Sequence, residues 1–205
     1  MQRGRRDHVP SAVVRKPDGR HNPNGVSCQR LEARGIGSVT GLPTSFRVEV
    51  LAEDDWRRLQ DIRTTALEAD PRAFLSSHET ETAFAEWQWR EQFSRGEWHV
   101  MRAGTRDIGL VGVTREPDTP PRECYLEYLW VAQSFRRRGV ATLLLRAVLD
   151  RLCDSGIQTV WLYILDGNDP AMRLYQEFGF QSTNQRQQLP DHPAGSEELM
   201  RLRLN

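Results

Sequence analysis

The chain has 205 residues, 38% of them hydrophobic, and its 28 basic and 28 acidic residues give a formal net charge of zero. That length suits one domain of ordinary size. No apolar run approaches the roughly 18 residues that a membrane helix needs and no signal peptide follows Met1, so we expect no membrane partner and a cytoplasmic location.

Residues 1–44 differ in composition from the rest of the chain. Pro, Gly, Ser, Asn and Arg dominate them, and apolar residues recur at neither the helical nor the strand period. They hold eight basic and three acidic residues, which leaves 20 basic and 25 acidic residues for 45–205. We therefore expect a disordered, basic extension before one acidic domain over 45–205. An acidic domain argues against nucleic-acid binding and favours a cationic amine.

The domain begins with an expected strand, Ser45 to Val50, and a helix that Asp54 or Asp55 caps and Pro71 ends. A second helical stretch is expected from Glu79 to Phe93. Its aromatic residues could line a substrate cleft, but packing is the favoured role for Phe84, Trp87 and Trp89.

Two short strands, Trp98 to Ala103 and Ile108 to Thr114, are expected next, as a hairpin. A strand from Tyr125 to Ala132, an amphipathic helix from Arg138 to Cys153 and an apolar strand from Thr159 to Leu165 then form a β-α-β unit. The two strands of such a unit are parallel.

The last part of the chain predicts one more helix and two strands. Asp169 as cap and Pro170 at the first helical position open the helix, and Gly179 ends it. Phe180 to Leu189 and Glu198 to Leu204 are predicted to form an antiparallel pair.

The segment Arg136 to Thr142, RRRGVAT, lies between the strand and helix of the β-α-β unit. Unpaired N–H groups at a helix start bind phosphate oxygens, and small residues at 139 and 141 let a ligand approach the backbone. The alternative is an ordinary helix cap beside solvated arginines. A nucleotide-binding P-loop is excluded, because the Lys-Ser/Thr pair that it requires is absent.

Two motifs in this order resemble those of the GNAT superfamily of acetyl-CoA dependent N-acetyltransferases. The first is LEYLWVAQSFRRRGVATLLL, from Leu126 to Leu145, with R-x-x-G-x-A; the second is N-x-x-A-x-x-L-Y-x-x-x-G-F, from Asn168 to Phe180. The resemblance implies an α/β (α+β) fold. Its mixed, mostly antiparallel sheet would have six or seven strands and about four flanking helices, with a splayed parallel pair that binds coenzyme A.

The resemblance also implies where acetyl-CoA binds as co-substrate. A bulged strand would offer the backbone of Leu129, Trp130 and Val131 to the pantetheine arm and the acetyl carbonyl. Asn168 would contact the cofactor arm from the opposite strand. The pyrophosphate would lie against Arg136, Arg137, Arg138, Gly139, Val140, Ala141 and Thr142.

For the chemistry, Tyr175 matches the family's general acid, and its alternative is a core tyrosine. Glu127 is the candidate base on the cofactor strand, and its alternative is a salt-bridged sheet residue. His99 and Tyr163 are lesser candidates for the base. Ribosomal-protein acetyltransferases of this superfamily have a glutamate five residues before the motif asparagine, where this chain has Tyr163.

The resulting prediction is an N-acetyltransferase acting by direct attack in a ternary complex. Ala73 to Phe93 loosely resembles the acceptor-side helices of small-molecule and antibiotic acetyltransferases, which favours a small-molecule amine over a peptide or protein amine as acceptor. The alternative function is a catalytically silent acyl-CoA binding or sensing module. Exposed edge strands permit a homodimer. No metal is expected, because no metal-ligand spacing links the cysteines at 28, 124 and 153.

Overall fold

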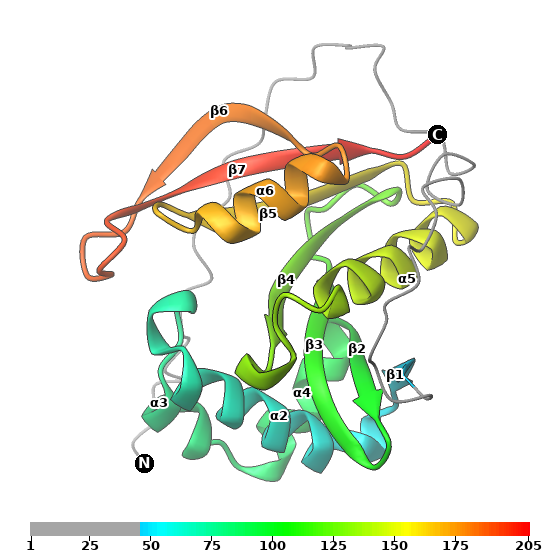
Figure 1. Cartoon of the computed structure of the whole chain (residues 1–205), viewed down its shortest axis with the longest axis vertical. Helices are drawn as coiled ribbons and strands as arrows, with labels where there is room; N and C mark the ends of the chain where they lie inside the picture. Colours follow the sequence, from blue (N-terminus) through cyan, green and yellow to red (C-terminus); the bar gives the residue numbers. More distant parts are fainter. Residues whose placement is uncertain (1–45) are drawn as a thin grey trace, which may run out of the picture.

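The computed structural model describes residues 46–205, and the extension expected over 1–44 lies outside them (Figure 1). Seven strands form one sheet in the order β1-β2-β3-β4-β5-β7-β6. All neighbours pair antiparallel except β4 and β5. The strands are β1 Phe46–Leu51, β2 Gly96–Ala103, β3 Arg106–Thr114, β4 Glu123–Val131, β5 Thr159–Leu165, β6 Gln181–Gln188 and β7 Ser196–Arg203.

Five α-helices accompany the sheet in this part of the chain, one more than the sequence predicts. They are α2 Trp56–Ala69, α3 His78–Thr82, α4 Glu86–Arg95, α5 Val140–Asp154 and α6 Asp169–Glu177. Three short 3-10 turns, η1 Glu53–Asp55, η2 Pro71–Ala73 and η3 Gln133–Phe135, complete the described elements. The mixed fold and the single parallel pair confirm the predicted architecture.

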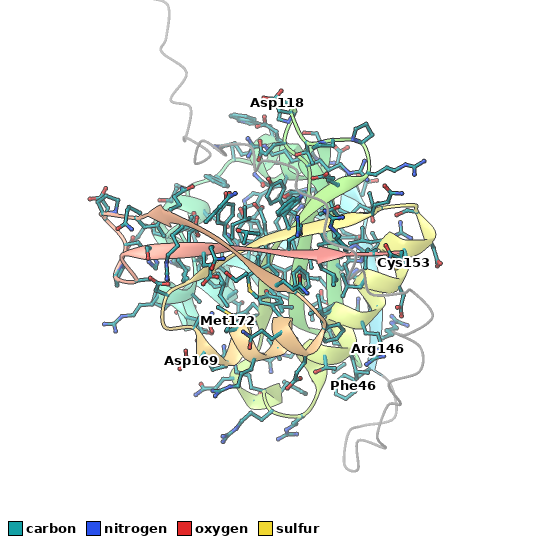
Figure 2. The ribbon with its side chains drawn as sticks, turned by 90° about the horizontal axis from the view of Figure 1, so that it is seen from above. Phe46, Asp118, Arg146, Cys153, Asp169 and Met172 are labelled. Atoms are coloured by element: carbon teal, nitrogen blue, oxygen red, sulfur yellow. The ribbon has the colours of Figure 1, made fainter. Side chains whose placement is uncertain are left out.

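The two faces of the sheet are covered by different helices. On one face lie α5 and α6; Figure 2 labels Arg146 of α5 and Met172 of α6. The guanidinium of Arg146 lies 5.8 Å from the ring of Phe178, the residue that follows α6. A Cβ on Gly109 of β3 would contact Leu144 of α5 on this face. The opposite face belongs to α2 and α4; there Trp98 of β2 donates its indole N–H to the carbonyl of Gln92.

Two expectations for the first helical region are wrong in detail. The single helix predicted from Glu79 to Phe93 is broken at residues 83–85 into α3 and α4. The predicted packing role holds for Trp89, which is buried and whose ring centroid lies 5.5 Å from that of Phe84. It is wrong for Trp87, which is 64% exposed. Trp87 misses the core because its side of α4 faces away from the sheet.

A buried ion pair fixes α3 against α2. The Arg63 Nε donates to Glu81 at 3.0 Å, and both side chains are almost fully buried. The Arg63 guanidinium also lies 4.1 Å from the ring of Tyr128 in β4 and 5.2 Å from the ring of Phe74. This pair therefore connects both helices to the central strand.

Replacing Glu81 by Ala should lower the free energy of unfolding by about 3–5 kcal/mol, because it leaves the Arg63 charge buried without a partner. Urea unfolding measures the effect. The exposed Glu79 on the same helix provides the control, since Glu79→Ala should change the free energy by less than about 0.5 kcal/mol. Equal effects of the two substitutions would contradict the assignment.

Candidate active site

The strand β4 carries a bulge where it passes β3. Leu110 faces Trp130 and Gly112 faces Glu127, so three steps along β4 match two steps along β3. Within this stretch Tyr128 has a φ of 60°, in the left-handed region that non-glycine residues rarely adopt. Neither Tyr128 nor Leu129 has a register partner in β3. The bulge that the family resemblance implies for this strand is present.

The parallel strands β4 and β5 pair only at their beginnings. Glu123 to Tyr125 lie opposite Thr159 to Trp161, and beyond them the two strands separate (Figure 1). The expected splayed pair is confirmed. Glu127 and Tyr163 each come two residues after the last paired position, where the strands have begun to separate.

The helix α5 begins beside this separation and has no side-chain cap. Its N-cap is Gly139, with a φ of 77°, and Arg137 two residues earlier also has a positive φ of 57°. Backbone N–H groups in the first turn of a helix have no acceptor within the helix, which here applies to Val140, Ala141 and Thr142. The positive end of the helix dipole adds to their attraction for an anion.

The side chain of Arg136 is bound by other residues of the chain. Its Nε donates to the carbonyl of Val131 at 2.7 Å, and its guanidinium pairs with Asp70, which follows α2. Asp70 also accepts a hydrogen bond of 2.7 Å from the indole N–H of Trp130. Burial opposes ionisation of Asp70, but these two donors outweigh it and lower its pKa. Sequence reasoning missed Asp70, because no motif connects it to residues sixty positions later.

The helix α6 carries the two motif residues Asn168 and Tyr175. Asn168 is the N-cap, and its side-chain oxygen accepts from the N–H of Ala171 at 3.3 Å. The cap is thus Asn168 and not Asp169, and the Asn168 side-chain NH₂ remains as a donor. Tyr175 is 8% exposed and lies 5.5 Å from the Phe180 ring. Burial raises the pKa of Tyr175, so its hydroxyl stays protonated at neutral pH.

Glu127 lies on the α2 side of the sheet, because it faces Gly112, whose Cβ would contact Trp98 and Tyr128. Burial is the main reason that the pKa of Glu127 lies above its ordinary value. Thr114 is close enough to oppose this shift, although its buried hydroxyl makes no hydrogen bond of good geometry. A carboxylate of raised pKa beside the separating strands suits a general base.

His99, one of the two lesser candidates for the base, lies on the opposite face of the sheet. It faces Val111, one residue from Gly112, so its side chain points toward α5. There it approaches Glu97, which accepts from Arg151 of α5. Burial lowers the pKa of His99 to about 4. The side chains of His99 and Glu127 therefore lie on opposite faces of the sheet.

A buried carboxyl group that sequence reasoning missed shares the face of the half-buried Glu127. Glu197 of β7 is 5% exposed and faces Leu165 of β5. Burial, and then the charge of Glu127, raises the pKa of Glu197 from 4.5 to about 7. The adjacent candidate Tyr163 of β5 has a raised pKa through burial and the charge of Glu197. No sequence motif marks Glu197, because only the sheet order brings β7 beside β5.

A bulged strand, a diverging parallel neighbour and an uncapped helix start between them are the features that the two sequence motifs imply. The chain belongs to the Acetyltransferase (GNAT) family, whose profile matches residues 56–180, more than half of the chain. This membership confirms the resemblance drawn from the two motifs.

Similarity to named proteins is partial. N-acetyltransferase 8B of Homo sapiens is 31% identical over 137 residues, 66% of this chain and 54% of that protein. The N-alpha-acetyltransferase RimI of Mycobacterium tuberculosis is 34% identical over 85 residues, 42% of this chain and 52% of that protein. The chain spans roughly half the length of the curated relatives it matches.

Solved structures of the same fold include some with a bound cofactor. The yncA protein of Salmonella typhimurium, solved with its cofactor acetyl-CoA, has a TM-score of 0.64 at 17% identity and covers 79% of this chain and 95% of that one. The Escherichia coli ribosomal-protein-S18-alanine N-acetyltransferase has a TM-score of 0.60 at 18% identity, over 78% of this chain and 94% of that one. At these identities the likeness shows the fold alone.

Within residues 46–205, no helix is both long and apolar enough to cross a membrane. In the same part of the chain, no three His, Cys, Asp or Glu side chains form a group that could hold a metal ion.

The raised pKa of Glu197 predicts a pH-dependent stability. Between pH 4.5 and about 7 the folded protein keeps a proton on Glu197 that the unfolded chain has lost, so the contribution of Glu197 to stability falls as pH rises through this window. Glu197→Gln removes this titration. Its thermal midpoint should exceed that of the wild type at pH 8, and the difference should shrink toward pH 5.

Thermal unfolding from pH 5 to pH 8 measures this effect. Glu198→Gln is the matched control, because Glu198 is the next residue of β7 and points to the opposite face. A constant difference between wild type and Glu197→Gln across this range would contradict the assigned titration.

Proposed function

We propose that the chain transfers an acetyl group from acetyl-CoA to a primary amine within a ternary complex. The observation that carries this proposal is the uncapped start of α5 beside the bulge of β4, where β4 and β5 separate. A helix start binds phosphate oxygens, and strand backbone freed from its ladder can bind amide and thioester groups. Acetyl-CoA carries both kinds of group.

The chain's own groups fit this co-substrate. We assign the pyrophosphate to the backbone from Gly139 to Thr142 and to the exposed side chains of Arg137 and Arg138. Arg136 is bound to Asp70 and to the carbonyl of Val131, and it thereby fixes the loop that precedes α5. The pantetheine arm and the acetyl carbonyl are assigned to the backbone of Leu129, Trp130 and Val131, with the side-chain NH₂ of Asn168 on the opposite strand.

In the reaction, Glu127 accepts a proton from the incoming ammonium, directly or through water, and leaves a neutral amine. The amine lone pair forms the C–N bond at the acetyl carbonyl, while backbone N–H groups near Leu129 stabilise the oxyanion. As the C–S bond breaks, Tyr175 gives its proton to the departing thiolate. The second proton of the nitrogen restores Tyr175, so amide and thiol form and one proton is released.

A small-molecule amine is the favoured acceptor. Tyr163 stands where a glutamate is expected in ribosomal-protein acetyltransferases, which argues against that subgroup despite partial similarity to RimI. The helices α3 and α4, on the acceptor side, match small-molecule acetyltransferases only loosely. Activity on an amine, a cytoplasmic location and a homodimer remain predictions for this chain.

A silent acyl-CoA binding or sensing module is the second candidate function. It needs the same cofactor groups but no proton donor. The retention of a buried, protonated Tyr175 favours the enzyme over the sensor.

The cofactor assignment is tested at Gly139. Replacement by Glu places a carboxylate at the phosphate position, and we expect micromolar binding of acetyl-CoA to weaken by on the order of 100-fold, about 2.7 kcal/mol. Calorimetric titration of acetyl-CoA into the full chain measures this. The control is Gly156→Glu, because Gly156 has a φ of 78°, follows the other end of α5 and has open space around a new Cβ.

Both substitutions carry the same backbone strain and the same added charge. Equal loss of affinity in both variants would show that strain or net charge is responsible, and the absence of acetyl-CoA binding by the wild type would overturn the proposed function.

Tyr175→Phe tests the proton donor. The substitution should lower kcat for thiol release by about 100-fold or more, with the affinity for acetyl-CoA unchanged. Steady-state assays of thiol release with a panel of amines provide the measurement. A core role for Tyr175 instead predicts a lower thermal midpoint with kcat retained.

A further inference from the structure

Most buried polar side chains among residues 46–205 have a partner. Of the six buried residues of this kind, Arg63 binds Glu81, Ser196 donates to Asp166, and His99 approaches Glu97. Of the two that remain, Thr114 has a buried hydroxyl without a hydrogen bond. The side chain of Glu197 is 5% exposed and takes part in no hydrogen bond or ion pair among residues 46–205.

Both of these side chains lie on the face that carries Glu127. Thr114 faces Tyr125 in the β3–β4 register, and Tyr125 is two residues from Glu127. Glu197 is two residues from Leu199, which faces Tyr163, so Glu197 and Tyr163 share a face. The parallel pairing of Tyr125 with Trp161 places this face on the same side of the sheet as Glu127.

An ionised carboxylate without a partner is costly to bury, and proteins normally pair such a group. The groups around the two glutamates do not supply that pairing. Arg63 and Arg95 both lower the pKa of Glu127, but Arg63 is already bound by Glu81, and Glu116 adds a negative charge that raises it. Glu127 and Glu197 therefore bring two carboxyl groups to one face of the sheet, and neither forms an ion pair with another residue among 46–205.

We propose that Glu197 and Glu127 together bind the ammonium group of the acceptor, and that Glu197 is the residue that selects a basic alkylamine. This inference rests on the proposed function and names the class of its acceptor. Glu127 then takes the proton, and Glu197 stays to hold the positive charge until the nitrogen is neutral.

The aromatic side chains of this face accommodate the body of the amine. The rings of Tyr125 and Tyr163 are parallel, with centroids 6.5 Å apart, and each offers an apolar face beside the carboxylates. An amine with an adjacent carboxylate, as in a free amino acid, would place a third negative charge here. The α-amino group of a peptide, with a pKa near 8, is also less dependent on an ammonium site than an alkylamine with a pKa near 10.

The test is calorimetric titration of amines into the full chain loaded with coenzyme A, which lacks the acetyl group and cannot react. The probes are butylamine, spermidine and 2-phenylethylamine, with norvaline and phenylalanine as matched amines that carry an α-carboxylate, and an alanine-starting peptide. We expect at least one alkylamine to bind, and its matched carboxylate and the peptide to bind at least about tenfold more weakly.

Glu197→Gln should weaken binding of that alkylamine by about tenfold or more and leave coenzyme A binding unchanged, whereas Glu198→Gln should change neither. The wild-type affinity should also fall from pH 8 to pH 6, as Glu197 takes up a proton, and Glu197→Gln should make this pH dependence clearly smaller, with Glu127 left to account for the remainder.

Alkylamine binding that is insensitive to Glu197→Gln, preference for the peptide or the amino acids, or no amine binding by a chain that binds coenzyme A would each overturn this inference alone. Failure of coenzyme A itself to bind would overturn the proposed function, and this inference with it.

Discussion

The outward turn of β4 at Tyr128 is the constraint on which the rest of the site depends. A non-glycine residue at positive φ costs on the order of 1 kcal/mol, and the surrounding contacts must offset that cost. Here the Tyr128 ring stacks on Trp98 with centroids 5.3 Å apart and lies beneath the guanidinium of Arg63. Beyond this turn, Leu129 has no partner in β3 and the indole of Trp130 donates to Asp70. Asp70 also pairs with Arg136, so it connects the end of α2 to the segment before α5.

Charge is distributed unequally over the α2 side of the sheet. Arg63 and Glu81 neutralise one another beneath the helices, whereas Glu127 and Glu197 face the separating strands with raised pKa values. The first pair holds the scaffold in place, and the two carboxyl groups of the second pair hold their protons more tightly than a free glutamate does. A buried ion pair and two carboxyl groups of raised pKa thus occupy the same face of the sheet.

Local sequence predicted the elements whose signals are local. The apolar repeat of α5, the apolar run of β5 and the Asn168 to Phe180 motif all fall within short windows, and family resemblance supplied the bulge. Asp70 and Glu197 were missed because their roles arise from contacts with residues far away in the chain. The break between α3 and α4 was missed because Phe84 and Trp89 keep an apolar pattern across it, although the helix itself stops.

The short pairing of β4 with β5 divides the sheet into two halves, β1 to β4 and β5 to β7, joined within the sheet by three residue pairs. Away from that seam, His192 in the loop between β6 and β7 makes a hydrogen bond of 3.2 Å with the carbonyl of Phe74, which follows α2. A molecule bound between the two halves would add contacts that hold β4 and β5 together beyond their three paired residues. The mechanical stiffness of the domain would then report directly on whether its co-substrate is in place.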